Sequence, residues 1–260
     1  MKRIVIKLGT STLTHETGLI NIRRFEKLVK VISDIKNSGI EVIIVSSGAI
    51  GLGTSKLKLD SKPTDMPTKQ AAASVGQCLL MSLYDEHFSK HNHMVSQILF
   101  TKDIVNDKIK KKNITNTFKR LLDFSVIPIV NENDSVSTDE IKEISRFGDN
   151  DTLSAIVASI CNADTLIMLS DIDGLFDKDP NKHEGAKLIS TVTELTDKIK
   201  SLTGNSVTNL GTGGMITKIE AAEICFDNSI QMIIINGNRP ENLYDVINGE
   251  KVGTWFKKSS

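Results

Sequence analysis

The sequence is poor in cysteine, carries no excess of either charge and has no long apolar run. Its cysteines, Cys78, Cys161 and Cys225, are odd in number, far apart and without a C-x-x-C spacing, so we expect reduced packing residues in a cytoplasmic protein. Thirty-two basic residues balance thirty-two acidic ones, which argues against a nucleic acid or a membrane surface as the main partner. No apolar segment approaches the roughly 20 residues that a membrane span needs.

Familiar nucleotide and calcium motifs are also missing. There is no G-x-x-x-x-G-K-[ST] sequence, which excludes a P-loop enzyme. Gly48, Gly51 and Gly53 are spaced G-x-x-G-x-G rather than G-x-G-x-x-G, and this disfavours a Rossmann dehydrogenase. The turn at residues 171–174 resembles the start of a calcium loop, but its glycine comes too early and the later glutamate is missing, so calcium binding is not expected.

Short β-rich runs alternate with longer segments of helical periodicity. We predict strands at residues 3–8, 41–46, 94–100, 126–130, 165–169 and 231–236, and helices at 22–38, 70–88, 113–124, 149–163 and 215–227. This alternation predicts an α/β fold, a three-layer αβα sandwich whose largely parallel sheet is covered on both faces. No linker or repeat divides the chain, and we expect one domain with two lobes that meet near Asp164.

Two lysines lie beside glycines at opposite ends of the chain. Lys7 ends the first apolar run just before Gly9, and Lys218 lies one turn into the helix that follows the glycines at 211, 213 and 214. A strand-end lysine that reaches solvent and a flexible helix start are the ordinary alternatives. If the fold brings both lysines together, a transferring phosphoryl group gains cations, backbone donors and a helix N-terminus, so the pattern predicts phosphoryl transfer.

Polar or glycine-rich sequence follows three of the predicted strands. The segments are residues 46–53 after the second strand, 131–134 after the fourth and 170–174 after the fifth. Because ligands bind beyond the carboxyl ends of parallel strands, we expect the site at this edge of the sheet. Ordinary turn chemistry is the alternative for each segment.

Three residues suited to helix capping open the predicted helix at 149–163. They are Asp149, Asn150 and Asp151, and together they exceed what one N-cap needs. A plain N-cap is the alternative for one of the carboxylates. We expect Asp149 or Asn150 to face a ligand and Asp151 to orient lysine side chains.

Seven motifs in a fixed order give the chain a resemblance to a known family. They are VIKLGTS, VSSGAIGLG, QAAASVGQ, NENDSVS, GDNDTLSA, LSDIDGLFDKDP and GTGGMITK. Together they resemble the amino acid kinase family, and within it the members that make γ-glutamyl phosphate from L-glutamate and ATP in the first step of proline biosynthesis. The resemblance covers nearly the whole chain, and its specificity lies in the shared order of the motifs.

The resemblance implies a lobe at about residues 1–164 that binds glutamate and a lobe at about residues 165–260 that binds ATP. By matching position, it implies that Lys7 and Lys218 contact the phosphates and that Asp151 organises these lysines. The implied glutamate-binding residues are Ser47, Gly48, Asp134, Asp149 and Asn150. The implied nucleotide-binding residues are Lys7, Gly9, Ser170, Asp171, Thr212, Gly213, Gly214, Met215, Ile216, Thr217 and Lys218. Mg²⁺ is expected to accompany ATP through phosphate oxygens and water, with no metal held by protein ligands alone.

The resemblance also implies feedback inhibition by L-proline and a homo-oligomer, either a dimer or a tetramer. Two features depart from the family pattern. Residues 140–147 form a longer stretch than is usual, which leaves Lys142 and Arg146 as alternatives for a basic position. Many relatives continue into a C-terminal PUA domain, whereas this chain stops at Ser260, so we expect any function of that module to be absent.

Two other interpretations stay open at this level. One is a sibling kinase that phosphorylates another acceptor, such as acetylglutamate, carbamate or UMP. The other is a non-catalytic sensor that binds a nucleotide or an amino acid and acts through a partner, although both lysines and the GDND sequence are intact.

Overall fold

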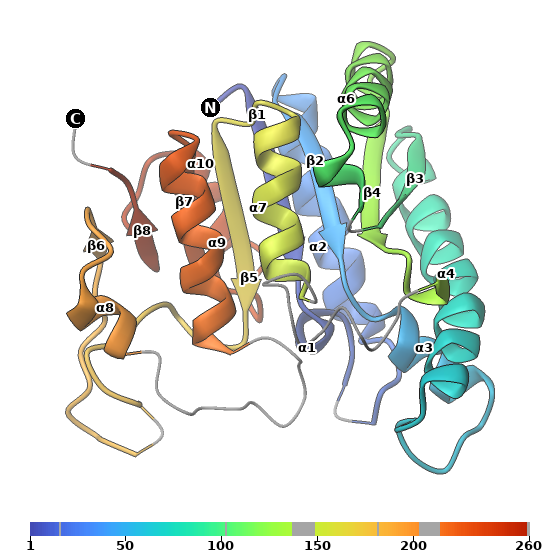
Figure 1. Ribbon diagram of the computed structural model, residues 1–260, viewed down its shortest axis with the longest axis horizontal. Helices are drawn as coiled ribbons and strands as arrows, with labels where there is room; N and C mark the ends of the chain where they lie inside the picture. The colour runs from blue at the N-terminus through green and yellow to red at the C-terminus, as the bar shows by residue number, and fades with distance from the viewer. Residues whose placement is uncertain (16, 102, 137–148, 181, 203–213, 259–260) are drawn as a thin grey trace.

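An eight-stranded sheet crosses the protein (Figure 1). The computed structural model describes residues 1–258 apart from 16, 102, 137–148, 181 and 203–213, and in these residues the strand order is β3-β4-β2-β1-β5-β7-β8-β6. The strands are β1 (Arg3–Leu8), β2 (Glu41–Ser46), β3 (Val95–Phe100), β4 (Ile127–Glu132), β5 (Thr165–Ser170), β6 (Thr191–Val192), β7 (Gln231–Asn236) and β8 (Thr254–Phe256). Strands β1 to β5 and β7 pair in parallel, whereas β8 runs antiparallel to β7. The predicted, largely parallel sheet is therefore confirmed.

Helices cover both faces of this sheet. The helices are α1 (Thr10–Leu13), α2 (Ile22–Asn37), α3 (Ala49–Lys56), α4 (Met66–Ser89), α5 (Asp103–Asn106), α6 (Lys108–Asp123), α7 (Asn150–Ile160), α8 (Asp197–Ser201), α9 (Met215–Asp227), α10 (Asn242–Ile247) and the 3₁₀ turn η1 (Asp134–Val136). Helices α6, α7 and α9 share one apolar core with the sheet, and α2, α3, α4 and α10 share the other. The predicted three-layer αβα sandwich is thus the observed architecture.

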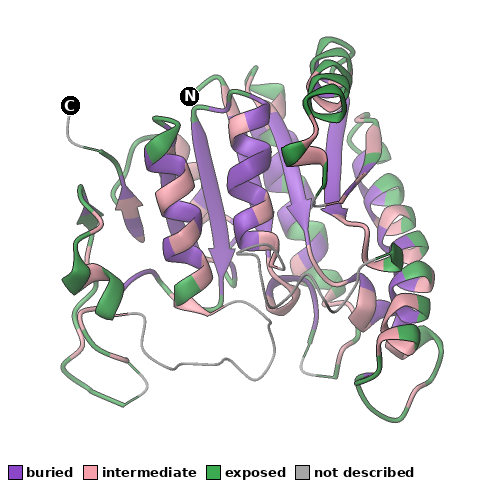
Figure 2. Ribbon diagram, viewed as in Figure 1, coloured by how far each residue is buried: buried purple, intermediate pink, exposed green. Residues whose placement is uncertain are grey.

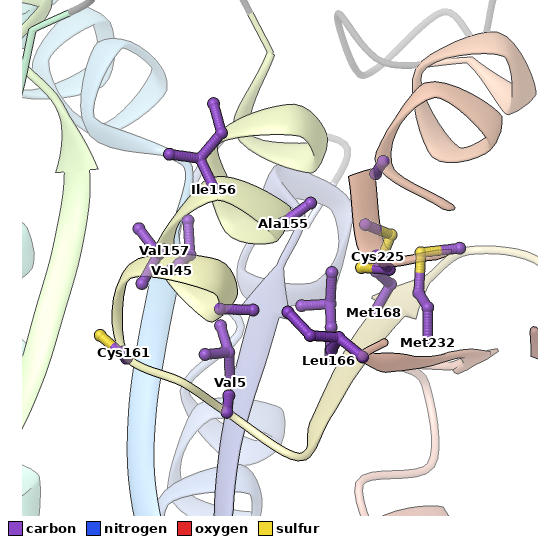
Figure 3. Packing of buried hydrophobic residues seen from close by; sticks show 14 of the residues in the cluster. Val5, Val45, Ala155, Ile156, Val157, Cys161, Leu166, Met168, Cys225 and Met232 are labelled. Atoms are coloured by element: carbon purple, nitrogen blue, oxygen red, sulfur yellow. The ribbon is translucent and has the colours of Figure 1, made fainter. Parts of the chain in front are cut away.

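The two cores follow from the alternation of side chains along each strand. In β1, Ile4, Ile6 and Leu8 belong to the core under α2 and α4, whereas Val5 belongs to the core under α7 and α9. Figure 3 shows Val5 beneath α7, and Figure 2 shows that α7 and the central strands are largely buried. Lys7 is two residues beyond Val5, so the same alternation directs its side chain toward α7 and α9.

Helices α3 and α4 pack backbone against backbone through two glycines. A Cβ atom added to Gly76 would lie 1.7 Å from the carbonyl oxygen of Ala49, and one added to Gly53 would lie 1.7 Å from that of Ala72. These contacts leave no room for a side chain. The crossing draws α4 close to the loop that follows β2, where the candidate site begins.

We expect Gly76→Ala to destabilise the protein because the two helices must separate to admit a methyl group. Overpacking of this kind costs about 3 kcal/mol or more, which corresponds to a fall of about 6–12 °C in the midpoint of thermal unfolding. The matched control is Gly51→Ala on α3, where nothing lies within 4 Å of the added Cβ atom. That change should stabilise the helix slightly, and equal effects of the two substitutions would contradict the packing argument.

Several predicted boundaries were wrong, and side-chain caps explain two of them. Helix α4 starts before residue 70 because the Asp65 carboxylate accepts a hydrogen bond from the Thr68 amide. Helix α6 starts before residue 113 because Asp107 caps the amides of Ile109 and Lys110. The short elements α1, α3, α5, α8, α10, β6 and β8 were not predicted.

The expectation for the cysteines was right for two of the three. Cys161 and Cys225 are buried with free thiols, whereas the free thiol of Cys78 belongs to an exposed residue of α4. Burial raises the pKa of both the Cys161 and the Cys225 thiol to about 12, so these thiols stay protonated. Among the described residues, no helix combines the length and apolar character that crossing a membrane requires.

Candidate functional site

One buried carboxylate holds the two lysines that the sequence separates by more than 200 positions. Lys7 Nζ lies 2.6 Å from Asp151 Oδ1, and Lys218 Nζ lies 3.1 Å from Asp151 Oδ2. Asp151 is 0% exposed, and each lysine is 7% exposed. The spatial convergence of the two ammonium groups, which the glycine-flanked lysines predicted, is present in the fold.

Three elements place these side chains. Lys7 lies near the carboxyl end of β1, Asp151 in the first turn of α7, and Lys218 in the first turn of α9. Helices α7 and α9 pack on the sheet face toward which Lys7 points. The Thr217 hydroxyl donates a hydrogen bond to Asp151 Oδ2 at 2.8 Å, so the carboxylate has a partner on each side and a fixed orientation.

The electrostatics keep Lys7 and Asp151 charged at neutral pH. Burial lowers the pKa of Lys7, but the attraction of Asp151, with smaller contributions from Asp149 and Asp171, outweighs it and the pKa is raised overall. Burial alone would raise the pKa of the Asp151 carboxyl, yet Lys7 and Lys218 hold it well below its usual range. The two lysines that share Asp151 supply cationic donors for an anionic ligand.

Asp149 caps the helix that carries this carboxylate. Its Oδ1 atom accepts a hydrogen bond from the Asp151 amide at 3.2 Å, as the N-cap alternative predicted. Its Oδ2 atom is buried and has no hydrogen-bond partner among the described residues. Burial, followed by the repulsion of Asp151, raises the pKa of the Asp149 carboxyl. This oxygen is therefore an acceptor without a donor.

Asn150, between the two aspartates, ties α7 to the ends of β2 and β4. Its Nδ2 group donates to Ser47 Oγ at 2.8 Å, to Asn131 Oδ1 at 3.1 Å and to the Ser46 carbonyl at 3.3 Å. Its Oδ1 atom is buried and has no partner in the described part of the chain. The N–H groups of the Asn150 amide are therefore paired, whereas its oxygen has no donor in the described part of the chain.

The turn after β2 places Ser47 beside this amide. Gly48 has a φ of 103° and is the N-cap residue of α3, a backbone conformation that glycine adopts without strain. No side chain caps this helix start, so backbone N–H groups of its first turn stay available to a ligand. This geometry fits both interpretations of Ser47 and Gly48, an ordinary turn and a ligand-binding segment.

The remaining residues of the predicted nucleotide site border the lysine cluster where the structure describes them. A Cβ atom added to Gly9 would lie 3.7 Å from Lys7 Nζ. Ser170 ends β5, and its hydroxyl donates to Asp171 Oδ1 at 3.1 Å. Gly214 is the N-cap of α9 without a side-chain cap, and Met215 and Ile216 begin the helix.

Some predicted residues cannot be placed in the same way. Thr212, Gly213, Lys142 and Arg146 lie outside the described residues. Asp134 begins the 3₁₀ turn η1 and is partly exposed. That turn is held against α4 by a 3.0 Å hydrogen bond between the hydroxyls of Ser74 and Ser135.

Sequence reasoning missed the role of Gln77, which joins the site from α4. Its Oε1 atom accepts a hydrogen bond from Asn131 Nδ2 at 3.0 Å. Asn131 was recognised only as part of the polar stretch after the fourth strand, and Gln77 only as a letter of the QAAASVGQ motif. No spacing rule connects two positions that are 54 residues apart.

The described residues contain no group of three or more histidine, cysteine or acidic side chains that could hold a metal ion. The lysines and the uncapped helix starts at this edge of the sheet support the binding of anions. Beside it lie the unpartnered oxygens of Asp149 and Asn150, which suit a cationic group.

Comparison with known proteins places this geometry in a family. The model of the amino acid kinase family matches residues 2–236. The chain is 53% identical over 255 residues to a protein of Clostridium perfringens (strain 13 / Type A) named glutamate 5-kinase, with 98% of this chain and 95% of the relative covered. It is 50% identical over 256 residues to the glutamate 5-kinase of Streptococcus uberis (strain ATCC BAA-854 / 0140J), with the same coverage. The crystal structure of UMP kinase from Ureaplasma parvum shares the fold, with a TM-score of 0.68, 17% identity and 99% of both chains covered.

Proposed function

Because the chain belongs to the amino acid kinase family, we propose that it transfers the γ-phosphoryl group of ATP to the γ-carboxylate of L-glutamate. The product is γ-glutamyl phosphate, the first intermediate of proline biosynthesis. The observation that carries the proposal is the sharing of the Asp151 carboxylate by Lys7 and Lys218, at 2.6 and 3.1 Å. Two buried ammonium groups gathered at one carboxylate suit the binding of a highly charged anion.

The reaction needs positioning and charge rather than a base. The γ-carboxylate of glutamate is ionised at neutral pH because its pKa is about 4.3. One of its oxygens attacks the γ-phosphorus, the bond to the β,γ-bridging oxygen breaks, and ADP leaves. Lys7, Lys218 and the backbone amides near Gly9 and Gly48 offset the repulsion between the two anions and stabilise the charge on the transferred group.

The α-ammonium of glutamate requires acceptors, and the site has them. Asn150 Oδ1 and Asp149 Oδ2 are buried oxygens without partners in the described chain. An unpaired buried acceptor costs about 1–3 kcal/mol, and an ammonium donor removes that cost. We assign the ammonium to Asn150, Asp149 and Asp134, and the α-carboxylate to the turn at Ser47 and Gly48.

ATP is assigned to the other half of the site. The adenosine and the phosphates lie along the ends of β5 and β7 and the start of α9, beside Ser170, Asp171 and the segment from Thr212 to Lys218. In this division, residues up to about 164 form the glutamate lobe and residues 165–260 the ATP lobe. Mg²⁺ enters bound to ATP, through phosphate oxygens and water.

The proposal is tested by trapping the acyl phosphate with hydroxylamine. Wild-type protein given MgATP and L-glutamate is expected to form the hydroxamate and one ADP for each turnover. N-acetylglutamate, carbamate and UMP are offered in parallel, with ADP release as the readout for the last two. Equal or faster turnover of any of them overturns the substrate assignment, and ligand binding without ADP formation favours a sensor.

The proposal extends to three further properties of this protein. L-proline is a feedback inhibitor, the working form is a homo-oligomer, either a dimer or a tetramer, and the enzyme acts in the cytoplasm. The resemblance of the motifs supports the first two extensions, and the free thiols of the three cysteines support the third.

A further inference from the structure

Ser46, at the end of β2, is a buried polar residue whose side chain the mechanism above does not use. Both Ser46 and Tyr84 of α4 are 0% exposed, and their hydroxyl oxygens lie 2.8 Å apart. Ser46 Oγ also donates to the Ser47 carbonyl oxygen at 3.1 Å. Because a serine hydroxyl carries one hydrogen, Tyr84 is the donor in the contact with Ser46. The hydrogen bonds therefore run from Tyr84 through Ser46 to the carbonyl of Ser47.

That carbonyl belongs to the peptide group that joins Ser47 to Gly48. The peptide groups on either side of it are held by the backbone, because Ser47 N–H donates to the Leu8 carbonyl and Leu52 N–H donates to the Gly48 carbonyl, both at 3.0 Å. In the described part of the chain, the Ser46 hydroxyl is the one hydrogen-bond partner of the peptide group between them. The orientation of this peptide group thus depends on a side chain.

Glycine lets the peptide group take either of two orientations. Gly48 has a φ of 103° and a ψ of −6°, close to the third residue of a type II turn, and turning the peptide over would give type I geometry with a negative φ. Glycine adopts both signs of φ about equally well, so Gly48 does not itself decide between them. The Ser46 hydroxyl favours the observed orientation, because turning the peptide over would take the Ser47 carbonyl away from it.

The orientation decides which group the turn offers to a ligand. In a trans peptide, as here, the N–H points opposite to the C=O. With the Ser47 carbonyl directed at Ser46, the Gly48 N–H points to the other side, where it has no acceptor among the described residues. Gly48 is partly exposed, so a ligand can reach this donor. In the opposite orientation a carbonyl oxygen would take its place and repel an anion.

We propose that Ser46 is a positioning residue that holds the Ser47–Gly48 peptide so that the Gly48 N–H donates a hydrogen bond to the α-carboxylate of the substrate. This inference rests on the proposed function, which assigns that carboxylate to this turn. Ser46 acts on glutamate binding without touching the substrate. Tyr84 satisfies the Ser46 oxygen and contributes to stability rather than to the orientation of the peptide.

The test is the effect of Ser46→Ala on the steady-state constants, measured by hydroxamate trapping. The variant removes the hydroxyl that holds the peptide, and we expect KM for L-glutamate to rise about tenfold, the equivalent of one lost hydrogen bond to a charged group. KM for ATP and kcat should each stay within about threefold of wild type, because the α-carboxylate does not react and is bound equally in the ground and transition states.

Tyr84→Phe is the matched control. It removes the same hydrogen bond between Ser46 and Tyr84 but leaves Ser46 able to donate to the Ser47 carbonyl. Both single variants should lower the midpoint of thermal unfolding by a few degrees, whereas only Ser46→Ala should raise KM for glutamate. The double variant Ser46→Ala/Tyr84→Phe leaves no hydroxyl of this pair unpaired, so it should regain stability with KM for glutamate still raised. It replaces Ser46→Ala if that variant does not fold.

Three results would overturn the role of Ser46 while the proposed function stands. One is an unchanged KM for glutamate in a folded variant without the Ser46 hydroxyl. Another is an equal rise in Tyr84→Phe, which would trace the effect to packing. The third is a change confined to kcat or to KM for ATP, which would separate this peptide from the α-carboxylate. Failure of the wild type to form a hydroxamate from glutamate overturns both proposals.

Discussion

Replacing Lys218 with methionine is expected to lower kcat for phosphoryl transfer about 10²–10³-fold, the usual loss when one preorganised donor to a transition-state charge is removed. Lys7→Met should have an effect of the same size, because both ammonium groups share Asp151 and both are proposed to contact the same phosphoryl group. Methionine matches the length and apolar stem of lysine. The loss is therefore one of charge and not of packing, and it should appear in kcat more than in the KM for glutamate.

The control for these substitutions is Lys90→Met, at the far end of α4. The Lys90 side chain is 55% exposed and pairs with Glu86 on the preceding helical turn, so its loss should leave kcat unchanged. Circular dichroism and thermal unfolding establish that each variant is folded before the rates are compared. Activity near the wild-type level in both Lys7→Met and Lys218→Met would defeat the proposed mechanism.

Asp151→Asn is expected to have the largest effect on stability. The substitution leaves two buried ammonium groups without their carboxylate, and breaking a buried ion pair in this way costs about 3–5 kcal/mol. The midpoint of thermal unfolding should fall by about 6–20 °C. Because the lysines also lose their anchor, kcat should fall about 100-fold. The control is Asp60→Asn, an exposed loop position, with an expected effect below about 0.5 kcal/mol.

The loss of stability in Asp151→Asn should depend on pH, and the direction of the pKa shifts says how. The pKa of Asp151 is lowered in the folded state, so its contribution to stability is complete above the unfolded value of about 3.9 and is lost as the pH falls through the folded value. The pKa of Lys7 is raised, so its contribution is complete below about 10.4 and is lost at higher pH. The stability difference between wild type and Asp151→Asn should thus shrink in acid, as the Asp151 carboxylate takes up a proton. A difference that grows below pH 4 would contradict this account.

Much of the fold was predictable from local pattern. Strand β5 is buried from end to end, and the interiors of β1, β2 and β7 are buried as well. Their apolar sequences identify central strands of a parallel sheet. The edge of the sheet was harder to foresee. Strand β8 has three residues and follows Gly253, whose φ of 70° turns the chain back on itself, and such a short antiparallel segment leaves no periodic signal.

The site was predictable only in part. Polar residues at strand ends and glycines near Lys7 and Lys218 indicated where the chemistry lies, and the order of the motifs indicated the family. The network from Gln77 through Asn131 to Asn150 was not foreseen. Each of its hydrogen bonds joins residues from different elements, so it exists only once α4 and α7 have packed on opposite faces of the sheet around the ends of β2 and β4.

The central claim is that Lys7 and Lys218, gathered by one carboxylate, reach the same phosphoryl group. A crystal structure with L-glutamate, Mg²⁺ and a non-hydrolysable ATP analogue tests it most directly. We predict that both Nζ atoms lie within about 3 Å of oxygens of the terminal phosphoryl group while Asp151 keeps its contact with each. A closed, liganded structure in which either ammonium group points away from that phosphate would contradict the mechanism.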